Sequence, residues 1–325
     1  MQTQTRRPVD ELARQAQRTL LAGGQPRAGP AAELVDTFLG AGSALSGMQP
    51  KVMVPVGDKA VVSAPNVIIK TEGARYPGLS ANEWMCLTAA RCAGLTVPAF
   101  DLSADGQLLV VDRFDILDDG TRLGFEDMAA LMQLRVRDRL SSRKYIGSYE
   151  DIAAALRLVC TRPAEALAQF FGYLVLSVLV RNGDAHLKNF GVLYDDQRTW
   201  LSPLYDQVTT TIYTYERPGG IESVDRTMAL KLRRGGRSGE ASRARAYPGL
   251  VELQDFGREV CGVYNPAAVV GRVQEGMRQA LALAEANTAV PGTVRRAMAQ
   301  AWRDGGLAGH SSDDFGRDKN VTRGD

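Results

Sequence analysis

The stretch Arg181-Asn-Gly-Asp-Ala-His-Leu-Lys-Asn-Phe190 follows a run of apolar residues and decides how the rest of the chain is interpreted. Asp184 and Asn189 lie five positions apart in it, in a segment rich in residues that favour loops. At this spacing a carboxylate and a carboxamide can face one cleft, where one contacts a nucleophile and the other a divalent metal ion. An ordinary turn is the alternative, because Asp and Asn are common in loops.

The Asp184–Asn189 spacing is that of the catalytic loop of protein kinases. There the Asp accepts the proton of the substrate hydroxyl, and the Asn binds a metal ion. A phosphotransfer site also needs a fixed cation, and Lys70 ends the β-branched stretch Val67-Ile-Ile-Lys70. This stretch resembles the kinase strand whose lysine contacts the phosphates of ATP. The alternative is a lysine on an edge strand that points into water.

Glu83 is the candidate acid for holding Lys70 in place. It lies on the next predicted helix, which we expect to begin at Ser80 and to end near Cys92. In protein kinases an acid on this helix pairs with the strand lysine. Ser80 and Glu83 also have the spacing of a capping box, in which Glu83 serves its own helix N-terminus. The sequence alone does not decide whether Glu83 pairs with Lys70 or caps its own helix.

Two further motifs flank this set. The small-residue stretch Gly42-Ser-Ala-Leu-Ser-Gly-Met-Gln-Pro-Lys51 is either a phosphate-binding loop, because glycine lets N–H groups approach phosphate oxygens, or a flexible surface loop. Asp206 ends Leu204-Tyr-Asp206 and offers a second carboxylate for Mg²⁺, although no glycine follows it and a turn is the alternative. Loop, lysine, glutamate, catalytic-loop pair and final aspartate follow in kinase order, which predicts a phosphotransferase.

The composition is that of a globular protein, with 325 residues, 45% of them hydrophobic, and a net charge of +2 at pH 7. This charge predicts no general attraction to nucleic acid or membrane. The four cysteines and two histidines do not have zinc-site spacing. The N-terminus lacks the apolar core of a secretory signal, and the most hydrophobic stretch, 167–180, is too short to span a bilayer. We therefore expect a cytoplasmic protein without membrane association.

Predicted strands precede predicted helices along the chain, with a junction near residue 114. Strands are expected at 52–56, 60–62, 67–70 and 107–114, and a later hairpin at 190–194 and 199–201. Helices are expected at 9–22, 31–38, 80–92, 125–135, 149–160, 164–181, 249–263, 266–287 and 291–303. This order predicts an α+β, two-lobed, protein-kinase-like fold. Its parts would be an N-terminal helical extension (1–39), a strand-rich N-lobe with the Gly/Ser-rich loop (40–113), a mostly helical C-lobe (114–303) and a tail expected to be disordered (304–325).

With these motifs in place, the sequence resembles the HipA family of toxin serine/threonine kinases over about residues 40–235. The residues that carry the resemblance are Ser46-Gly-Met-Gln-Pro-Lys51, Val67-Ile-Ile-Lys70, Asn82-Glu83, Val110-Val-Asp-Arg-Phe114, Asn182-Gly-Asp-Ala-His-Leu-Lys-Asn189 and Pro203-Leu-Tyr-Asp206. The resemblance implies that Asp184 is the catalytic base and that Asn189 and Asp206 bind Mg²⁺. The ATP contacts that it implies are Ser46, Gly47, Gln49, Lys51, Lys70, Asp112, Phe114, His186 and Lys188, with 112–114 as the hinge against adenine.

Less chain precedes the Gly-rich loop than in long HipA proteins, which carry an extra N-terminal subdomain there. In this respect the sequence is similar to the short HipT-type kinases, whose missing subdomain is a small separate HipS-like protein. The family autophosphorylates serine in the Gly-rich loop. This implies Ser46 here, with Ser43 as the second candidate, because Ala44 replaces the first serine of the Ser-x-Ser element. Backbone flexibility alone is the other interpretation of these serines.

The resemblance implies an ATP- and Mg²⁺-dependent serine/threonine kinase that is the toxin of a HipBST- or HipBA-like toxin–antitoxin system. The implied partners are a translation component such as an aminoacyl-tRNA synthetase and a helix-turn-helix HipB-like antitoxin that bridges to DNA. The alternatives are a lipid or small-molecule kinase on the same fold and a non-catalytic pseudokinase that binds the antitoxin. The basic stretch 231–245 is either a solvated loop or a docking site for an acidic partner or a tRNA-bound substrate.

Overall fold

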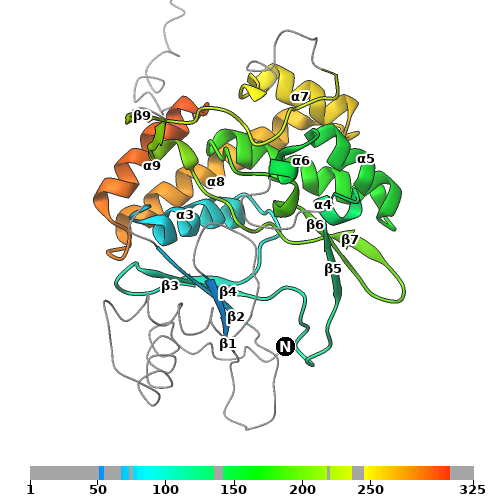
Figure 1. Cartoon of the computed structure of the whole chain (residues 1–325), viewed down its shortest axis with the longest axis horizontal. Coiled ribbons are helices and arrows are strands. Elements are labelled where there is room, and N and C mark those ends of the chain that lie inside the picture. The colour runs from blue at the N-terminus through cyan, green and yellow to red at the C-terminus, as the bar shows by residue number, and fades with distance from the viewer. Residues whose placement is uncertain are drawn as a thin grey trace, which may run out of the picture.

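The computed structural model describes residues 51–54, 67–72, 76–134, 142–217, 220–235 and 245–307. The predicted helices 9–22 and 31–38, the predicted strand 60–62, the Gly/Ser-rich loop before residue 51 and the tail after residue 307 lie outside these ranges. Among the described residues, small sheets precede and flank a larger set of helices, so the predicted α+β class is confirmed (Figure 1).

A four-stranded antiparallel sheet in the order β1-β2-β4-β3 forms the N-terminal part. Its strands are β1 (Lys51–Val54), β2 (Val67–Thr71), β3 (Phe100–Leu102) and β4 (Leu108–Asp112). Lys70 pairs with Lys51 on one side and with Leu109 on the other, so β2 is an internal strand. The Lys70 residue is only 3% exposed, which excludes the interpretation as an edge lysine in water. Strand β3 was not predicted, because three residues are too short to give a pattern.

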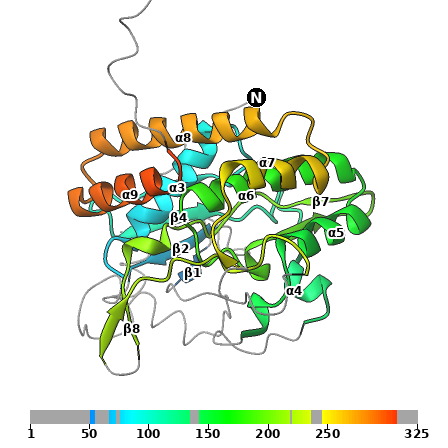
Figure 2. The ribbon, with the colours of Figure 1, turned by 90° about the horizontal axis from the view of Figure 1, so that it is seen from above.

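Helix α3 (Leu79–Cys92) lies between this sheet and the C-terminal helices (Figures 1 and 2). It begins one residue earlier than predicted, and its N-cap is Gly78, whose left-handed backbone (φ 73°) suits glycine. Ser80 lies inside the helix, and its hydroxyl donates to the backbone oxygen of Gln107 at 2.9 Å. The predicted Ser80–Glu83 capping box is therefore wrong. Ser80 bonds instead to the residue just before β4, and the Glu83 carboxylate contacts Lys70.

The backbones of α3 and α8 (Pro266–Ala286) approach closely at Gly276. A Cβ atom at this position would lie 2.5 Å from the backbone oxygen of Ala89 and 2.6 Å from the backbone nitrogen of Ala93. Neither atom can move without displacing α3, so only glycine fits there. This contact fixes the distance between the helix that carries Glu83 and the C-terminal helices.

Gly276→Ala is expected to lower the free energy of unfolding by about 1–3 kcal/mol, because the added methyl group overpacks the α3–α8 contact. Urea denaturation followed by circular dichroism measures this change. Gly271→Ala is the matched control on the same helix, since a Cβ atom there meets nothing within 4 Å. We expect this control to be stabilising by up to about 1 kcal/mol from helix propensity. Equal effects of the two substitutions would contradict the close approach.

A second sheet has the order β5-β6-β7 and lies beside the helices (Figure 1). Its strands are β5 (Gly124–Asp127), β6 (Gly191–Tyr194) and β7 (Thr199–Leu201), and the last two confirm the predicted hairpin. The predicted helix 125–135 is wrong in its first part. Residues 124–127 pair with the distant β6, and only α4 (Met128–Leu131) is helical, after the Asp127 carboxylate caps it. Tertiary pairing here outweighs local helical spacing.

The remaining helices confirm the predicted pattern within a few residues at each end. They are α5 (Tyr149–Val159), α6 (Pro163–Leu179), α7 (Leu250–Glu259) and α9 (Gly292–Asp304), together with α8. Helix α6 is buried along most of its length, and the stretch 181–190 follows directly after its C-cap. Short elements complete the described part: β8 (Tyr215–Arg217), β9 (Ile221–Ser223), and the 3-10 helices η1 (Ser142–Tyr145), η2 (Leu187–Asn189) and η3 (Thr210–Ile212).

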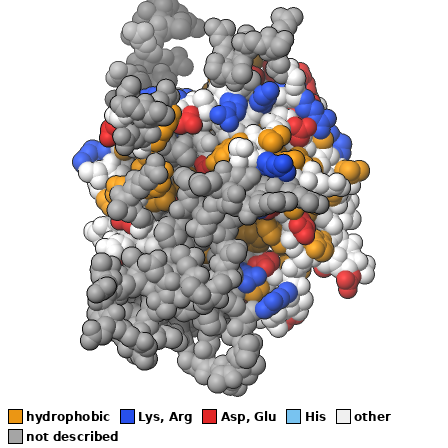
Figure 3. All heavy atoms as spheres, viewed as in Figure 1, with side chains coloured by type: hydrophobic (Ala, Val, Ile, Leu, Met, Phe, Trp, Pro, Cys, Tyr) orange, Lys and Arg blue, Asp and Glu red, His pale blue; other side chains and the backbone are white. Residues whose placement is uncertain are grey.

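The two signs of charge are not separated on the part of the described surface that Figure 3 draws. On the face drawn in Figure 3, basic and acidic side chains are interspersed, in keeping with the near-neutral net charge. Of the basic stretch 231–245, Arg233 pairs with Glu259 at 2.7 Å and Arg234 pairs with Asp151. Within the described ranges no helix is both long enough and apolar enough to cross a bilayer.

Candidate active site

Lys70, Glu83 and Asp206 meet in one ion cluster, although they come from β2, α3 and the segment after β7. The Lys70 ammonium contacts the carboxylates of both Glu83 and Asp206. Lys70 and Glu83 are almost fully buried, whereas the Asp206 side chain is about a quarter exposed, at 26%. Burial alone would lower the pKa of Lys70, but the Asp206 and Glu83 carboxylates together raise it above its ordinary value. The lysine is therefore a fixed, buried cation held by two carboxylates that line the cavity.

Asp206 has a left-handed backbone, with φ 52°, which is uncommon for a residue other than glycine. The next residue, Gln207, is fully buried, and its Oε1 accepts hydrogen bonds from the Ser177 hydroxyl at 3.0 Å and the Asn182 amide at 3.1 Å. The same network thus ties the Asp206 segment to α6 and to the stretch that contains Asp184. A strained backbone persists only where its surroundings hold it, and Gln207 supplies that support.

Gln207→Leu is expected to lower the free energy of unfolding by about 1–3 kcal/mol, because it leaves the buried Asn182 amide without this acceptor, whereas the Ser177 hydroxyl can still donate to the Tyr173 backbone oxygen. Thermal or urea denaturation measures this loss. The control is Gln279→Leu on the exposed face of α8, which should stay within about 0.5 kcal/mol of the parent. A Gln207→Leu protein as stable as the parent would show that the network does not hold Asp206.

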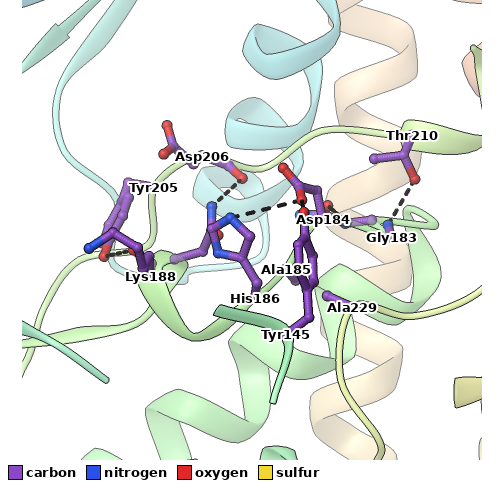
Figure 4. A network of polar contacts seen from close by, with 12 residues as sticks. Tyr145, Gly183, Asp184, Ala185, His186, Lys188, Tyr205, Asp206, Thr210 and Ala229 are labelled. Carbon is purple, nitrogen blue, oxygen red and sulfur yellow. Dashed lines mark hydrogen bonds and ion pairs between the residues drawn. The ribbon is translucent and has the colours of Figure 1, made fainter. Parts of the chain in front are cut away.

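Asp184 lies where the chain leaves α6, and hydrogen bonds fix its loop from several sides (Figure 4). The Asp184 backbone N–H donates to the side-chain oxygen of Asn182 at 3.0 Å, and the Gly183 N–H donates to the Thr210 hydroxyl at 2.8 Å. The Asp184 side chain is 34% exposed, and its Oδ1 accepts a hydrogen bond from the Tyr145 hydroxyl at 2.6 Å. A carboxylate in this position can accept a proton from a group in the cleft.

Asn189 has the free oxygen that a metal ligand needs. Its Oδ1 is buried and has no hydrogen-bond partner among the described residues, while its Nδ2 lies 3.5 Å from the backbone oxygen of Asp206. A buried amide oxygen without a partner is costly unless another group binds it. Carboxylate and amide oxygens are the ligands that Mg²⁺ prefers, so Asn189 and Asp206 fit the ion. The described residues contain no cluster of three or more His, Cys, Asp or Glu side chains that suggests a different metal.

His186 and Lys188 lie in the same loop as Asp184, and the side chain of each lies close to a carboxylate. The His186 Nε2 lies 3.8 Å from Asp184 Oδ1, and burial lowers the pKa of His186 although Asp184 opposes this effect. The ring is therefore predominantly neutral at pH 7. The Lys188 ammonium pairs with Asp127, and the Lys188 backbone oxygen accepts from the Tyr205 hydroxyl at 2.8 Å. The Lys188 side chain is thus held by an ion pair with Asp127, at the end of β5.

A cavity of about 600 Å³ brings part of the predicted set together. Six predicted residues line it, namely Glu83, Asp184, His186, Lys188, Asn189 and Asp206. Lys70 does not line it, but its ammonium contacts two residues that do, Glu83 and Asp206. Sequence reasoning missed other lining residues, including Tyr145, Thr210, Tyr213, Asp225 and Arg245. The hydroxyl-rich run after Asp206 was a possible signal for Thr210 and Tyr213, whereas nothing in the local sequence marks Tyr145.

The predicted hinge residues do not line this cavity. Asp112 ends β4, and the Phe114 ring packs against Phe125 and Tyr205, with ring centroids 5.6 and 5.4 Å apart. Phe114 therefore belongs to an aromatic cluster between β4 and the second sheet. Ser43, Ser46, Gly47 and Gln49 lie outside the described residues, and Lys51 is placed only through its backbone pairing in β1.

Residues 43–286 match the family described as HipA-like C-terminal domain. Two proteins of Sinorhizobium fredii named as candidate kinases are similar in sequence: Y4mE is 33% identical over 180 residues and Y4dM is 35% identical over 162 residues. The Y4mE match covers 52% of this chain and 43% of that protein, and the Y4dM match covers 45% and 38%. The chain thus spans less than half of the length of these two relatives.

Solved structures show the same fold. The HipA protein of Shewanella oneidensis, determined in complex with HipB and operator DNA, matches with a TM-score of 0.58 and 18% identity over 81% of this chain and 64% of that chain. The kinase CtkA of Helicobacter pylori matches with a TM-score of 0.51 and 13% identity over 74% of this chain and 86% of that chain. At these identities the likeness confirms the predicted kinase-like fold and nothing further.

Proposed function

The chain belongs to the HipA-like C-terminal domain family, and on that premise we propose that it is an ATP-dependent serine/threonine protein kinase. One observation carries the proposal: Lys70, Glu83 and Asp206 form a buried ion cluster beside Asp184 and Asn189, although they come from distant parts of the sequence. A fixed cation, a base and two oxygen ligands around one cleft are the groups that phosphoryl transfer needs. The sequence similarity to proteins named as candidate kinases agrees with this assignment.

Each residue of the cluster has a distinct part in the proposed reaction. Glu83 holds the Lys70 ammonium beside Asp206, from where it would bind phosphate oxygens of ATP. Asp184 would orient the hydroxyl of a substrate serine or threonine and accept its proton. Asn189 Oδ1 and the Asp206 carboxylate would bind Mg²⁺, which supplies charge neutralisation at the phosphates. The chain's own contribution is therefore mainly positioning and electrostatic stabilisation.

The wider biological assignment follows the family. We propose that the chain is the toxin of a HipBA- or HipBST-like system in the cytoplasm, with a HipB-like antitoxin and DNA as partners, by analogy with the Shewanella complex. A HipS-like small protein, a translation component such as an aminoacyl-tRNA synthetase as substrate, and autophosphorylation on Ser46 or Ser43 belong to the same proposal. Phosphoproteomics after induction, with site mapping on the toxin itself, tests the substrate and the autophosphorylation site.

Incubation of the purified chain with radiolabelled ATP and Mg²⁺ tests the kinase proposal directly. We expect label to be transferred to serine or threonine of the chain itself or of added casein, and EDTA to prevent the transfer. Label that appears only in a lipid or a small molecule would favour the other kinase class on this fold. If ATP raises the melting temperature but no acceptor is labelled, the chain is a nucleotide-binding pseudokinase and the proposal is wrong.

A further inference from the structure

Tyr145 contacts the proposed catalytic base directly, and no sequence motif marks it. Its hydroxyl donates to Asp184 Oδ1 at 2.6 Å, and both residues line the same cavity (Figure 4). Resting on the proposed function, we infer that Tyr145 is a positioning residue. It holds one oxygen of the Asp184 carboxylate so that the other oxygen, Oδ2, receives the proton of the acceptor hydroxyl.

Within the described part of the chain, the side-chain contacts of the Asp184 carboxylate fall on one of its two oxygens. Oδ1 accepts the Tyr145 hydrogen bond, and the approach of His186 Nε2, at 3.8 Å, is to the same atom. The side chain is nevertheless 34% exposed, so part of the carboxylate remains open to the cavity. A carboxylate fixed at one oxygen loses the freedom to rotate, which presents the second oxygen in one orientation. A proton acceptor is effective only in such a fixed geometry.

Tyr145 is itself held in place, as a positioning residue must be. Its ring meets the His186 ring edge-on, with centroids 5.2 Å apart, and the Lys144 ammonium lies 5.1 Å from the Tyr145 ring centroid. The element that carries it, η1, packs against η2, which contains Lys188 and Asn189. Burial and the neighbouring Asp184 carboxylate raise the pKa of the Tyr145 hydroxyl, so it remains protonated and acts as a donor.

A different role for the same hydrogen bond makes the opposite prediction. If the Tyr145 hydroxyl occupied the place of the acceptor hydroxyl, its removal would free the base and accelerate transfer. If Tyr145 positions Asp184, its removal lets the carboxylate rotate and slows transfer. A displacement of a reacting group by about 1 Å can cost a hundredfold in rate. The sign of the change therefore separates the two roles.

Tyr145→Phe removes only the hydroxyl and is the test. We expect kcat for transfer from radiolabelled ATP to protein to fall about tenfold to a hundredfold, and KM for ATP to stay within about twofold of the parent, because the nucleotide contacts are intact. Tyr149→Phe is the matched control, since the Tyr149 hydroxyl donates to the Ala185 backbone oxygen of the same loop at 3.0 Å but does not contact the base. It should lower the melting temperature and reduce kcat much less.

Three outcomes would overturn the inference. A Tyr145→Phe enzyme that is as fast as the parent or faster, while Asp184→Asn is inactive, shows that Tyr145 does not position the base. Equal losses of kcat in Tyr145→Phe and Tyr149→Phe, with equal falls in melting temperature, show that both hydroxyls act only through folding. Full activity of Asp184→Asn shows that the proposed base is wrong, and the inference falls with it. The first two outcomes leave the proposed kinase function standing.

Discussion

Asp184→Asn is expected to lower kcat for phosphotransfer by about 10²- to 10⁴-fold, the range that a positioned general base contributes. The carboxamide has nearly the shape of the carboxylate, and its oxygen can still accept the Tyr145 hydrogen bond. The backbone hydrogen bond from residue 184 to Asn182 is also retained. What the substitution removes is the group that accepts a proton from the acceptor hydroxyl. Transfer of label from radiolabelled ATP to protein, measured at saturating ATP and Mg²⁺, checks the expected loss.

Nucleotide binding separates this loss from a failure to fold. Because Lys70, Asn189 and Asp206 are unchanged, the rise in melting temperature caused by ATP and Mg²⁺ should be the same in Asp184→Asn as in the parent. Asp196→Asn, in the exposed turn between β6 and β7, is the control for the same chemical change away from the cavity. Activity of Asp184→Asn close to that of Asp196→Asn would mean that another residue is the base or that the reaction needs none.

The order of motifs along the sequence predicted which distant residues would meet. The stretch Val67-Ile-Ile-Lys70 has the pattern of a strand. Glu83 lies on the predicted helix that follows, and Asp206 follows a short predicted hairpin. The kinase-like order of these motifs therefore predicted that three charged residues meet at one cleft. The structure brings these side chains into contact and adds that β2 is internal, which the sequence alone left open. The prediction from motif order was correct here because each of these residues lies on a short element whose neighbouring elements are set by the fold.

The sequence did not predict features that depend on tertiary neighbours. Tyr145 is close to Asp184 only because η1 packs against η2, and no local pattern encodes that contact. Ser80 has capping-box spacing, yet it donates to the distant Gln107, and Gly78 is the N-cap of the helix instead. Residues 124–127 have helical spacing but pair with β6. In each case a partner far away in sequence outweighed the local preference.

Lys70→Met is expected to damage both activity and stability. The variant loses the cation proposed to bind ATP phosphates, and loss of one such preorganised donor typically costs about 10²- to 10³-fold in kcat. It also removes the Lys70 ammonium from the Glu83 carboxylate, whose side chain is only 1% exposed. Removing one partner of a buried pair costs about 3–5 kcal/mol, so the free energy of unfolding should fall by this amount. Urea denaturation measures the stability, and Lys231→Met on the exposed surface is the control.

The double variant Lys70→Met/Glu83→Leu separates the two losses. Because apolar residues of similar volume replace the buried pair, most of the stability lost in Lys70→Met should return. Phosphotransfer should not return, since the cation at the cleft remains absent. This dissociation distinguishes a lysine that acts in the cleft from one that only neutralises the buried Glu83 carboxylate. If the double variant regains both stability and activity, Lys70 is structural, and the cation that the proposed reaction needs must come from another residue.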